Sequence, residues 1–190
     1  MNNEEERHLV TRAKVDPEAF GELYRRYVDR IYNYHYRHTS SRVEAEDLTS
    51  RTFYRALRSL EGYKETGAPF QAWLFRIAHN LVVNWYRDST SHPTVSIDID
   101  DPLPLPSAMP NPESWLTAAE TRRALVKVIE SLPEERKTLI ILKFVERMSN
   151  VEIGEVMGKT EGAIKALYHR TLISLKKIMR EGSADVQAVE

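Results

Sequence analysis

The sequence has no cysteine, only seven glycines and no long hydrophobic run. Without cysteine there can be no disulfide and no thiolate zinc site, and the six histidines do not repeat at metal-ligand spacing. No segment approaches the roughly 20 apolar residues of a membrane-spanning helix, so we expect a cytoplasmic protein. Few glycines and few β-branched runs favour helices. The 190 residues therefore predict an all-α protein, with one medium domain or two small ones.

An excess of either charge is also lacking, since 27 Lys and Arg residues nearly balance 28 Asp and Glu residues. This balance excludes a chain-wide attraction to nucleic acid, so any such surface must be local. Acidic residues and prolines gather in residues 88–114, where there is no Lys or Arg and helical periodicity stops. We predict two helical domains, 1–90 and 115–182, joined by an extended acidic, proline-rich linker, 91–114, and followed by a tail, 183–190.

Motifs of common enzymes are absent as well: there is no glycine-rich phosphate loop, no His-Glu-x-x-His and no nucleophile elbow. The first turn of a helix explains the acidic pair Glu134-Glu135, and the solvated linker explains Asp100-Asp101. We therefore predict that the chain is not an enzyme and that it uses no cofactor, no metal and no small-molecule substrate.

Three helices are predicted in the first domain. Asp16 and Pro17 form a helix cap and a first-turn proline, and a second helix should run from about Arg42 to Leu60. After a break at residues 61–69, a third helix begins, and each helix has apolar residues at helical spacing. The three stripes are Phe20, Leu23, Tyr24, Tyr27 and Ile31; Ala45, Leu48, Thr52, Ala56 and Leu60; and Leu74, Ile77, Ala78, Leu81 and Trp85.

Aromatic residues concentrate in the first domain, where residues 1–87 hold 14 of the 17 in the chain. Several alternate with basic or amide residues, as in residues 32–37 and 84–87, and aromatic rings beside cations suit the stacking of unpaired bases. The alternative is that Trp73, Phe75 and Trp85, at helical spacing, belong to the core. The sequence leaves both interpretations open.

The second domain contains helix-turn-helix spacing. Residues 149–152, Ser-Asn-Val-Glu, are a capping box that starts a short helix, Gly158 interrupts it, and a longer helix begins at Thr160 or Glu161. The small residue Gly154 suits a helix crossing. Lys159 departs from the pattern, because an apolar residue usually follows the turn glycine.

The longer helix has an apolar arc and an opposite polar arc. The inward arc should contain Ile164, Leu167, Tyr168, Leu172, Leu175 and Ile178. Because a recognition helix enters the major groove with its N-terminal part, seven residues are candidates for DNA contact. They are Thr160, Glu161, Ala163, Lys165, Ala166, His169 and Arg170. The alternative is that they form the solvated polar face of an ordinary bundle helix.

Taken together, these motifs resemble the extracytoplasmic-function (ECF) sigma factors of the sigma-70 family, the small promoter-specificity subunits of bacterial RNA polymerase. The resemblance covers about residues 16–180 and places both blocks of motifs in the family's order. The first block is Ala45-Glu46-Asp47-Leu48, Thr52-Phe53, residues 70–80 and Trp85-Tyr86-Arg87; the second is Leu132-Pro133-Glu134-Glu135, residues 149–158, Gly162-Ala163-Ile164-Lys165 and His169-Arg170.

The resemblance implies two DNA-reading domains that act on one promoter. The break at residues 61–69 would capture a base flipped from the melted nontemplate strand, and the helix-turn-helix would read the minus-thirty-five element of the duplex. The linker would thread toward the active-site cleft of the polymerase or merely set the domain spacing. Core-polymerase contacts would come from Glu46, Asp47, Leu48, Arg51 and Phe53, and minus-ten contacts from Tyr63, Lys64, Arg76, Asn80, Asn84 and Arg87.

The resemblance also implies an anti-sigma partner, which in this family is frequently membrane-bound, and a nucleoid location within the holoenzyme. Two positions depart from the family's pattern: Ser50 and Arg51 stand where Gln and an acid are frequent, and Ala166-Leu167 stands where Ser-Arg is frequent. A free-standing helix-turn-helix regulator of duplex operators is the main alternative function. A helical adaptor is a third one.

Overall fold

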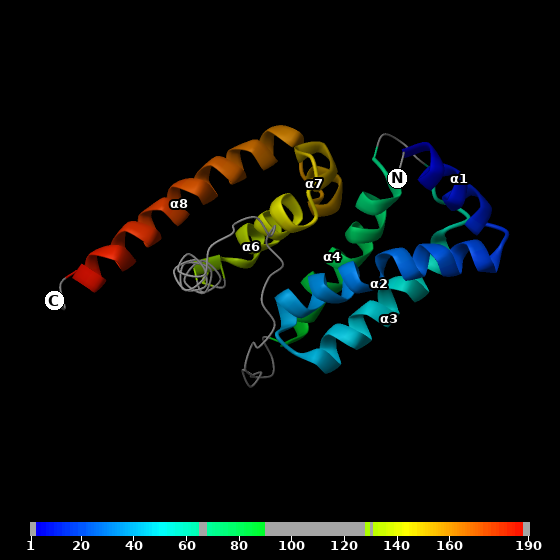
Figure 1. Cartoon of the computed structure of the whole chain (residues 1–190), viewed down its shortest axis with the longest axis horizontal. Helices are drawn as coiled ribbons and strands as arrows, with labels where there is room; N and C mark the ends of the chain where they lie inside the picture. Colours follow the sequence, from blue (N-terminus) through cyan, green and yellow to red (C-terminus); the bar gives the residue numbers. More distant parts are fainter. Residues whose placement is uncertain (1–2, 65–67, 90–127, 130, 188–190) are drawn as a thin grey trace, which may run out of the picture. The chain divides into compact units, whose positions relative to one another are not determined.

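In the computed structural model, the described residues are 3–64, 68–89, 128–129 and 131–187 (Figure 1). All regular elements within these ranges are helices, which confirms the all-α fold class. The predicted linker, 91–114, lies outside the described residues. None of the described helices has the length and apolar character needed to cross a membrane.

Contacts between helices divide the chain into two units, which are described separately. Unit 1 comprises Met1–Asp100 with Val151–Thr160, and unit 2 comprises Asp101–Asn150 with Glu161–Glu190. Unit 1 contains the helices α1, α2, α3, α4 and α7, and unit 2 contains α6, η1 and α8. The predicted boundaries of the two domains stay predictions.

Four helices of unit 1 pack around one core. The helices are α1 (Asn3–Ala13), α2 (Pro17–Thr39), α3 (Arg42–Ser59) and α4 (Phe70–Ser89), and α2 packs against the other three (Figure 1). The predicted cap of α2 is confirmed, because the Asp16 side chain accepts a hydrogen bond from the Glu18 N–H at 2.9 Å. Ser40, in the left-handed conformation with φ 51°, ends α2 and lets the chain reverse into α3.

The first helix, α1, was not among the predicted elements. Its start is acidic and carries no apolar stripe, but Leu9, Val10 and Ala13 at its end are buried. The Tyr27 hydroxyl of α2 donates a hydrogen bond to the Glu6 carboxylate of α1. Burial, followed by this hydrogen bond, raises the pKa of Tyr27 far above its ordinary value. Three buried apolar side chains and one hydrogen bond to α2 therefore hold α1 in unit 1.

The predicted apolar stripe of α3 is confirmed in full, since Ala45, Leu48, Thr52, Ala56 and Leu60 are all buried. In α2 the prediction holds for Leu23, Tyr27 and Ile31, whereas Tyr24 is exposed and packs edge-on against the Phe53 ring, with centroids 4.7 Å apart. In α4, Leu74, Ala78 and Leu81 are buried, and Ile77 and Trp85 are half-buried. Of the three aromatic residues that the second interpretation assigned to the core, Phe75 is buried, whereas Trp73 and Trp85 are half-buried.

Unit 2 has a short helix that changes its hydrogen-bonding pattern. Helix α6 (Glu134–Ile140) continues as the π-helix η1 (Ile141–Val145), and the Glu146 N–H donates to the Ile141 carbonyl at 3.1 Å. Leu139 and Leu142 lie fully buried within this segment. The long helix α8 (Glu161–Gln187) packs on α6.

The prediction that Leu172 faces inward on α8 is wrong. Leu172 is 40% exposed, and its neighbour Thr171 is buried with its hydroxyl donating to the Leu167 carbonyl at 2.8 Å. Ile164 and Leu167 are buried as predicted, while Tyr168, Leu175 and Ile178 are half-buried. The 100° step places Leu172 on the inner arc, but the backbone-bonding threonine occupies the buried position at this level of α8.

Candidate functional site

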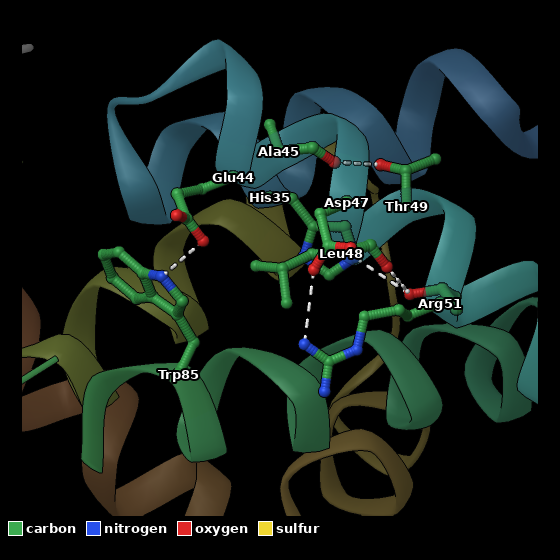
Figure 2. Close-up of polar contacts among 9 residues, drawn as sticks. His35, Glu44, Ala45, Asp47, Leu48, Thr49, Arg51 and Trp85 are labelled. Atoms are coloured by element: carbon green, nitrogen blue, oxygen red, sulfur yellow. Dashed lines mark hydrogen bonds and ion pairs between the residues drawn. The ribbon is translucent and has the colours of Figure 1, made fainter. Parts of the chain in front are cut away.

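The outer face of α3 carries the acids that were predicted to bind a partner. Glu46, Asp47 and Arg51 are exposed, and the Arg51 Nη1 lies 3.3 Å from the Asp47 Oδ2 (Figure 2). This ion pair spans four residues of one helix and is open to solvent, so it contributes about 0.3–0.5 kcal/mol to stability. Either side chain can therefore leave this ion pair and bind a charged group of a partner at little cost in free energy.

Two other residues predicted to contact the polymerase lie inside unit 1. Leu48 is 1% exposed and Phe53 is 6% exposed, so neither can touch a partner while the unit is folded. The reason is helical periodicity, which places Leu48 on the same stripe as Ala45 and Thr52. Both side chains belong to the core beneath the outer face of α3, and their role in binding the polymerase stays a prediction.

The start of α3 is tied to the end of α4. The Trp85 Nε1–H donates to the Glu44 Oε2 at 2.9 Å (Figure 2). The next residue, Tyr86, donates through its hydroxyl to the His38 carbonyl of α2 at 2.6 Å. Glu44 is not among the residues predicted for either contact surface of unit 1. Nothing in the local sequence signals this bond, because its partners are 41 residues apart.

Histidine and tyrosine side chains fill the centre of unit 1. The Tyr34 hydroxyl lies 3.1 Å from the His79 Nδ1, and the His35 Nε2 lies 3.0 Å from the Thr52 hydroxyl. The Tyr34 and His38 rings have centroids 4.7 Å apart. Burial, with the neighbouring His38, lowers the pKa of His35 to about 3 and that of His79 to about 4. Both imidazoles are therefore neutral near neutral pH.

The polar face of α4 forms the second predicted surface. Arg76, Asn80 and Arg87 are exposed and Asn84 is half-buried, so amide and guanidinium groups follow one another along the helix. The Arg87 Nε lies 3.5 Å from the Asp88 carboxylate in an exposed pair. Such groups can bind phosphates and base edges.

Tyr63 and Lys64, from the break before α4, differ in placement. Tyr63 is only 8% exposed and packs against the Phe70 and Trp73 rings, whereas Lys64 is exposed. Both line a pocket of about 180 Å³ between this segment and α1, to which Lys14 also contributes. The Lys14 Nζ donates to the Tyr63 carbonyl at 2.7 Å. Tyr63 can therefore offer only an edge of its side chain to a ligand.

The predicted helix-turn-helix elements are confirmed along the chain. Helix α7 (Asn150–Met157) begins directly after Ser149, and Gly158 follows with φ 64°, a conformation that side chains disfavour. Helix α8 then begins at Glu161. All seven predicted DNA-contact residues are exposed, and the Lys165 Nζ lies 2.7 Å from the Glu161 carboxylate.

Metal chemistry finds no support in the part of the chain that the structure describes. No three His, Cys, Asp or Glu side chains there come together as a metal site.

Comparison with known proteins identifies the family. The family profile of Sigma-70 region 2 matches residues 23–92, and that of Sigma-70, region 4 matches residues 122–175. The chain is 34% identical over 172 residues to the ECF RNA polymerase sigma factor BldN of Streptomyces coelicolor, covering 90% of this chain and 64% of BldN. It is 28% identical over 176 residues to the ECF RNA polymerase sigma factor SigW of Bacillus subtilis, covering 88% of this chain and 92% of SigW. The chain thus spans less than two thirds of BldN.

Solved structures show the same fold. CnrH, in complex with the cytosolic domain of CnrY, has a TM-score of 0.68 at 20% identity, covering 93% of this chain and 97% of CnrH. The sigma factor RpoE, in complex with the anti-sigma factor NepR from Bartonella quintana, has a TM-score of 0.64 at 18% identity, covering 85% of this chain and 96% of RpoE. With both regions matched in the predicted order, the chain belongs to the sigma-70 family, as an ECF RNA polymerase sigma factor.

Proposed function

We propose that this sigma factor binds core RNA polymerase through α3 and directs it to promoters through α4 and α8, without catalysing a reaction itself. The observation that carries the proposal is the placement of exposed side chains: Glu46 and Asp47 lie side by side in the first half of α3, amides and guanidinium groups lie along α4, and α8 begins with exposed residues after a glycine turn. The proposed domains remain 1–90 for polymerase and minus-ten binding and 115–182 for minus-thirty-five binding.

On α3, the contact residues of the proposal are Glu46, Asp47 and Arg51. Two exposed carboxylates close together favour a basic partner surface and fix its orientation through charge complementarity. The buried residues Leu48 and Phe53 anchor this helix in the core of unit 1. The family's clamp coiled coil of the polymerase is the partner that we propose for this face.

On α4, we propose that Arg76, Asn80, Asn84 and Arg87 hold the melted nontemplate strand and the adjacent duplex. Opening a base from the stack costs a few kcal/mol, which contacts in a protein pocket must return. The pocket beside Lys64 lies at the start of this helix and supports base capture there. Lys64 would bind phosphate at its rim.

On α8, we propose that the seven exposed residues after the turn read the minus-thirty-five element. Lys165 and Arg170 are placed to contact phosphates or guanines, and a bidentate contact to a base contributes about 1–3 kcal/mol of discrimination. Ala166 offers only a methyl group where many relatives of this family carry a serine. The promoter sequence should therefore differ from those of such relatives.

An anti-sigma factor is part of the proposal. CnrH was solved with the cytosolic domain of CnrY, and RpoE was solved with the anti-sigma factor NepR. We propose that a protein of this kind also binds this chain and keeps it from the polymerase. The chain would then act in the cytoplasm, at the nucleoid within the holoenzyme, and at the membrane when a membrane-bound partner holds it.

Transcription in vitro tests the proposal directly. Purified bacterial core polymerase and a genomic fragment library are incubated with and without the protein, and the new RNA 5′ ends are sequenced. We expect new transcripts that share a pair of upstream motifs. No new transcript, together with sequence-specific binding of the protein alone to duplex fragments, would instead establish a free-standing regulator.

The α3 contact can be tested with one charge reversal. Asp47→Arg places a cation where a basic partner is expected, so we expect loss of co-elution with core polymerase and an unchanged far-ultraviolet circular dichroism spectrum. Glu22→Lys, which reverses another exposed acid on α2, is the matched control and should co-elute normally. Normal co-elution of Asp47→Arg would rule out this interface.

A further inference from the structure

The first turn of α3 has the sequence of a capping box but not its full hydrogen-bond pattern. Ser41 caps the helix and accepts from the Glu44 N–H at 3.4 Å. In a complete capping box, the Glu44 carboxylate would return to the Ser41 N–H. Here the Ser41 N–H donates to the Thr39 hydroxyl at 3.3 Å, and the Glu44 Oε2 accepts from Trp85 of α4 at 2.9 Å. The carboxylate thus joins two helices in place of capping one.

A second bond acts at the same place. The Tyr86 hydroxyl donates to the His38 carbonyl at 2.6 Å, in the last turn of α2. The Trp85 and Tyr86 rings contact each other with centroids 5.0 Å apart. The last turns of α4 are therefore held at the connection between α2 and α3 from two sides. Figure 2 shows the Glu44 side of this arrangement.

We infer that Glu44 is a positioning residue, which sets the DNA-facing residues of α4 relative to the polymerase-facing acids of α3. The inference rests on the proposed function. Glu44 lies two residues before Glu46 on the polymerase-facing helix, and Trp85 lies between Asn84 and Arg87 on the DNA-facing helix. A hydrogen bond with a charged acceptor is among the stronger polar contacts, and this one is partly buried.

Loss of this bond should leave the unit folded. The apolar contacts of α4 come from Leu74, Phe75, Ala78 and Leu81, which are buried independently of Glu44. The end of α4 would gain freedom, while the outer face of α3 would keep its acids. Loss of the bond should therefore slow promoter opening without weakening the binding of core polymerase. A purely stabilising role of Glu44 does not predict this difference.

The experiment uses full-length Glu44→Ala, Glu44→Gln, Trp85→Phe and the double variant Glu44→Ala/Trp85→Phe. Core-polymerase affinity is measured by fluorescence, and the rate of open-complex formation is measured on a promoter found by the transcription experiment above. Glutamine keeps an acceptor oxygen, and phenylalanine keeps a ring without the N–H. Thr49→Val is the control, because it removes a 2.6 Å bond of the Thr49 hydroxyl whose acceptor, the Ala45 carbonyl, lies in the same helix.

We expect core affinity within about twofold of wild type for all variants. The opening rate should fall about three- to tenfold for Glu44→Ala and Trp85→Phe, recover in Glu44→Gln, and fall no further in the double variant. Thr49→Val should lower the melting temperature without slowing promoter opening. If Glu44→Ala opens promoters at the wild-type rate, or loses core affinity by the same factor, the inference is wrong while the proposed function stands. A wild-type protein that forms no open complex overturns both.

Discussion

Units 1 and 2 are both helical, but they are held together by different chemistry. The buried aromatic residues of the described chain, among them Tyr27, Tyr34 and Phe75, all belong to unit 1, where the buried His35 and the half-buried His79 hydrogen-bond to side chains of other helices. The described apolar core of unit 2 contains leucine, isoleucine and methionine, with no aromatic ring, beside the buried polar residues Lys137, Thr138, Glu146 and Thr171. The core of unit 1 therefore contains aromatic rings and hydrogen bonds between side chains of different helices, and the apolar core of unit 2 is aliphatic.

This difference matters for function because polar contacts are directional. A buried hydrogen bond is satisfied at one relative placement of two helices and penalises others, whereas aliphatic side chains repack with smaller losses. Unit 1 carries two proposed surfaces, on α3 and α4, whose relative placement must be kept. Its polar core is suited to that requirement. The proposed surface of unit 2 lies on a single helix and makes no such demand.

The largest expected effect comes from the aliphatic core. Leu139→Ala in unit 2 should lower the free energy of unfolding by about 2–5 kcal/mol, because it removes a fully buried side chain and leaves a cavity. Urea denaturation followed by helicity would measure the loss. The fluorescence of Trp73 and Trp85, in unit 1, should keep its own transition. A joint shift of both transitions would show that the two units unfold together.

The next largest effect is a pH dependence of the free energy of unfolding of unit 1. His35 and His79 have pKa values lowered from 6.5 to about 3 and about 4, so the folded state binds fewer protons than the unfolded state as the pH falls below 6.5. Their stabilising contribution is present above that pH and declines below it. At about pH 5.5 the two sites together should cost ~2–3 kcal/mol relative to pH 8.

Tryptophan-detected urea denaturation between pH 5 and pH 8 measures this effect. The variants His35→Gln and His79→Asn keep a hydrogen-bonding atom near the Nε2 and Nδ1 positions but do not titrate, so each should remove about half of the pH dependence and the double variant should remove most of it. An undiminished slope in the double variant would assign the pH dependence to other groups.

A smaller effect is expected from one hydroxyl at the centre of unit 1. Tyr34→Phe removes the partner of the His79 Nδ1 while keeping the ring, and should cost about 1–2 kcal/mol. Calorimetric melting provides the measurement. A neutral result would mean that the aromatic packing of unit 1 matters more than its hydrogen bonds, which would weaken the contrast between the two units.

The smallest effect on stability is expected at the surface of α8. Lys165→Ala should change the unfolding free energy by less than about 0.5 kcal/mol, because its pair with Glu161 is exposed. It should nevertheless lower the slope of log affinity for promoter DNA against log salt concentration by about 1. Lys176→Ala, farther along the helix, should leave the slope unchanged. Equal slopes for Lys165→Ala and wild type would exclude a phosphate contact.

Local signals in the sequence predicted much of the fold. The Asp16-Pro17 cap, the stripe from Ala45 to Leu60 and the glycine turn at Gly158 depend on neighbouring residues, and each is confirmed. The helix α1 was missed because its few apolar residues become meaningful only against α2. The same limit applies to Leu172, whose exposure depends on what packs against that part of α8.

The candidate site was predicted less completely. The family resemblance pointed to the acids of α3, and residue type and spacing pointed to the start of α8; both sets are exposed. Neither signal showed that Leu48 and Phe53, expected among the contact residues, are buried. The bond between Glu44 and Trp85 joins residues far apart in the chain, so only the folded structure reveals it.

The short ion pair of Glu161 with Lys165 has a consequence for a search of the genome, if α8 reads DNA as we propose. Random DNA offers many more phosphates than promoters do. A lysine that already has a carboxylate four residues away gains less from a random phosphate, because the carboxylate stays close and repels the strand. Only a site that satisfies both members of the pair recovers the full attraction. On this proposal, the pair shortens visits to decoy sites and adds selectivity to the search.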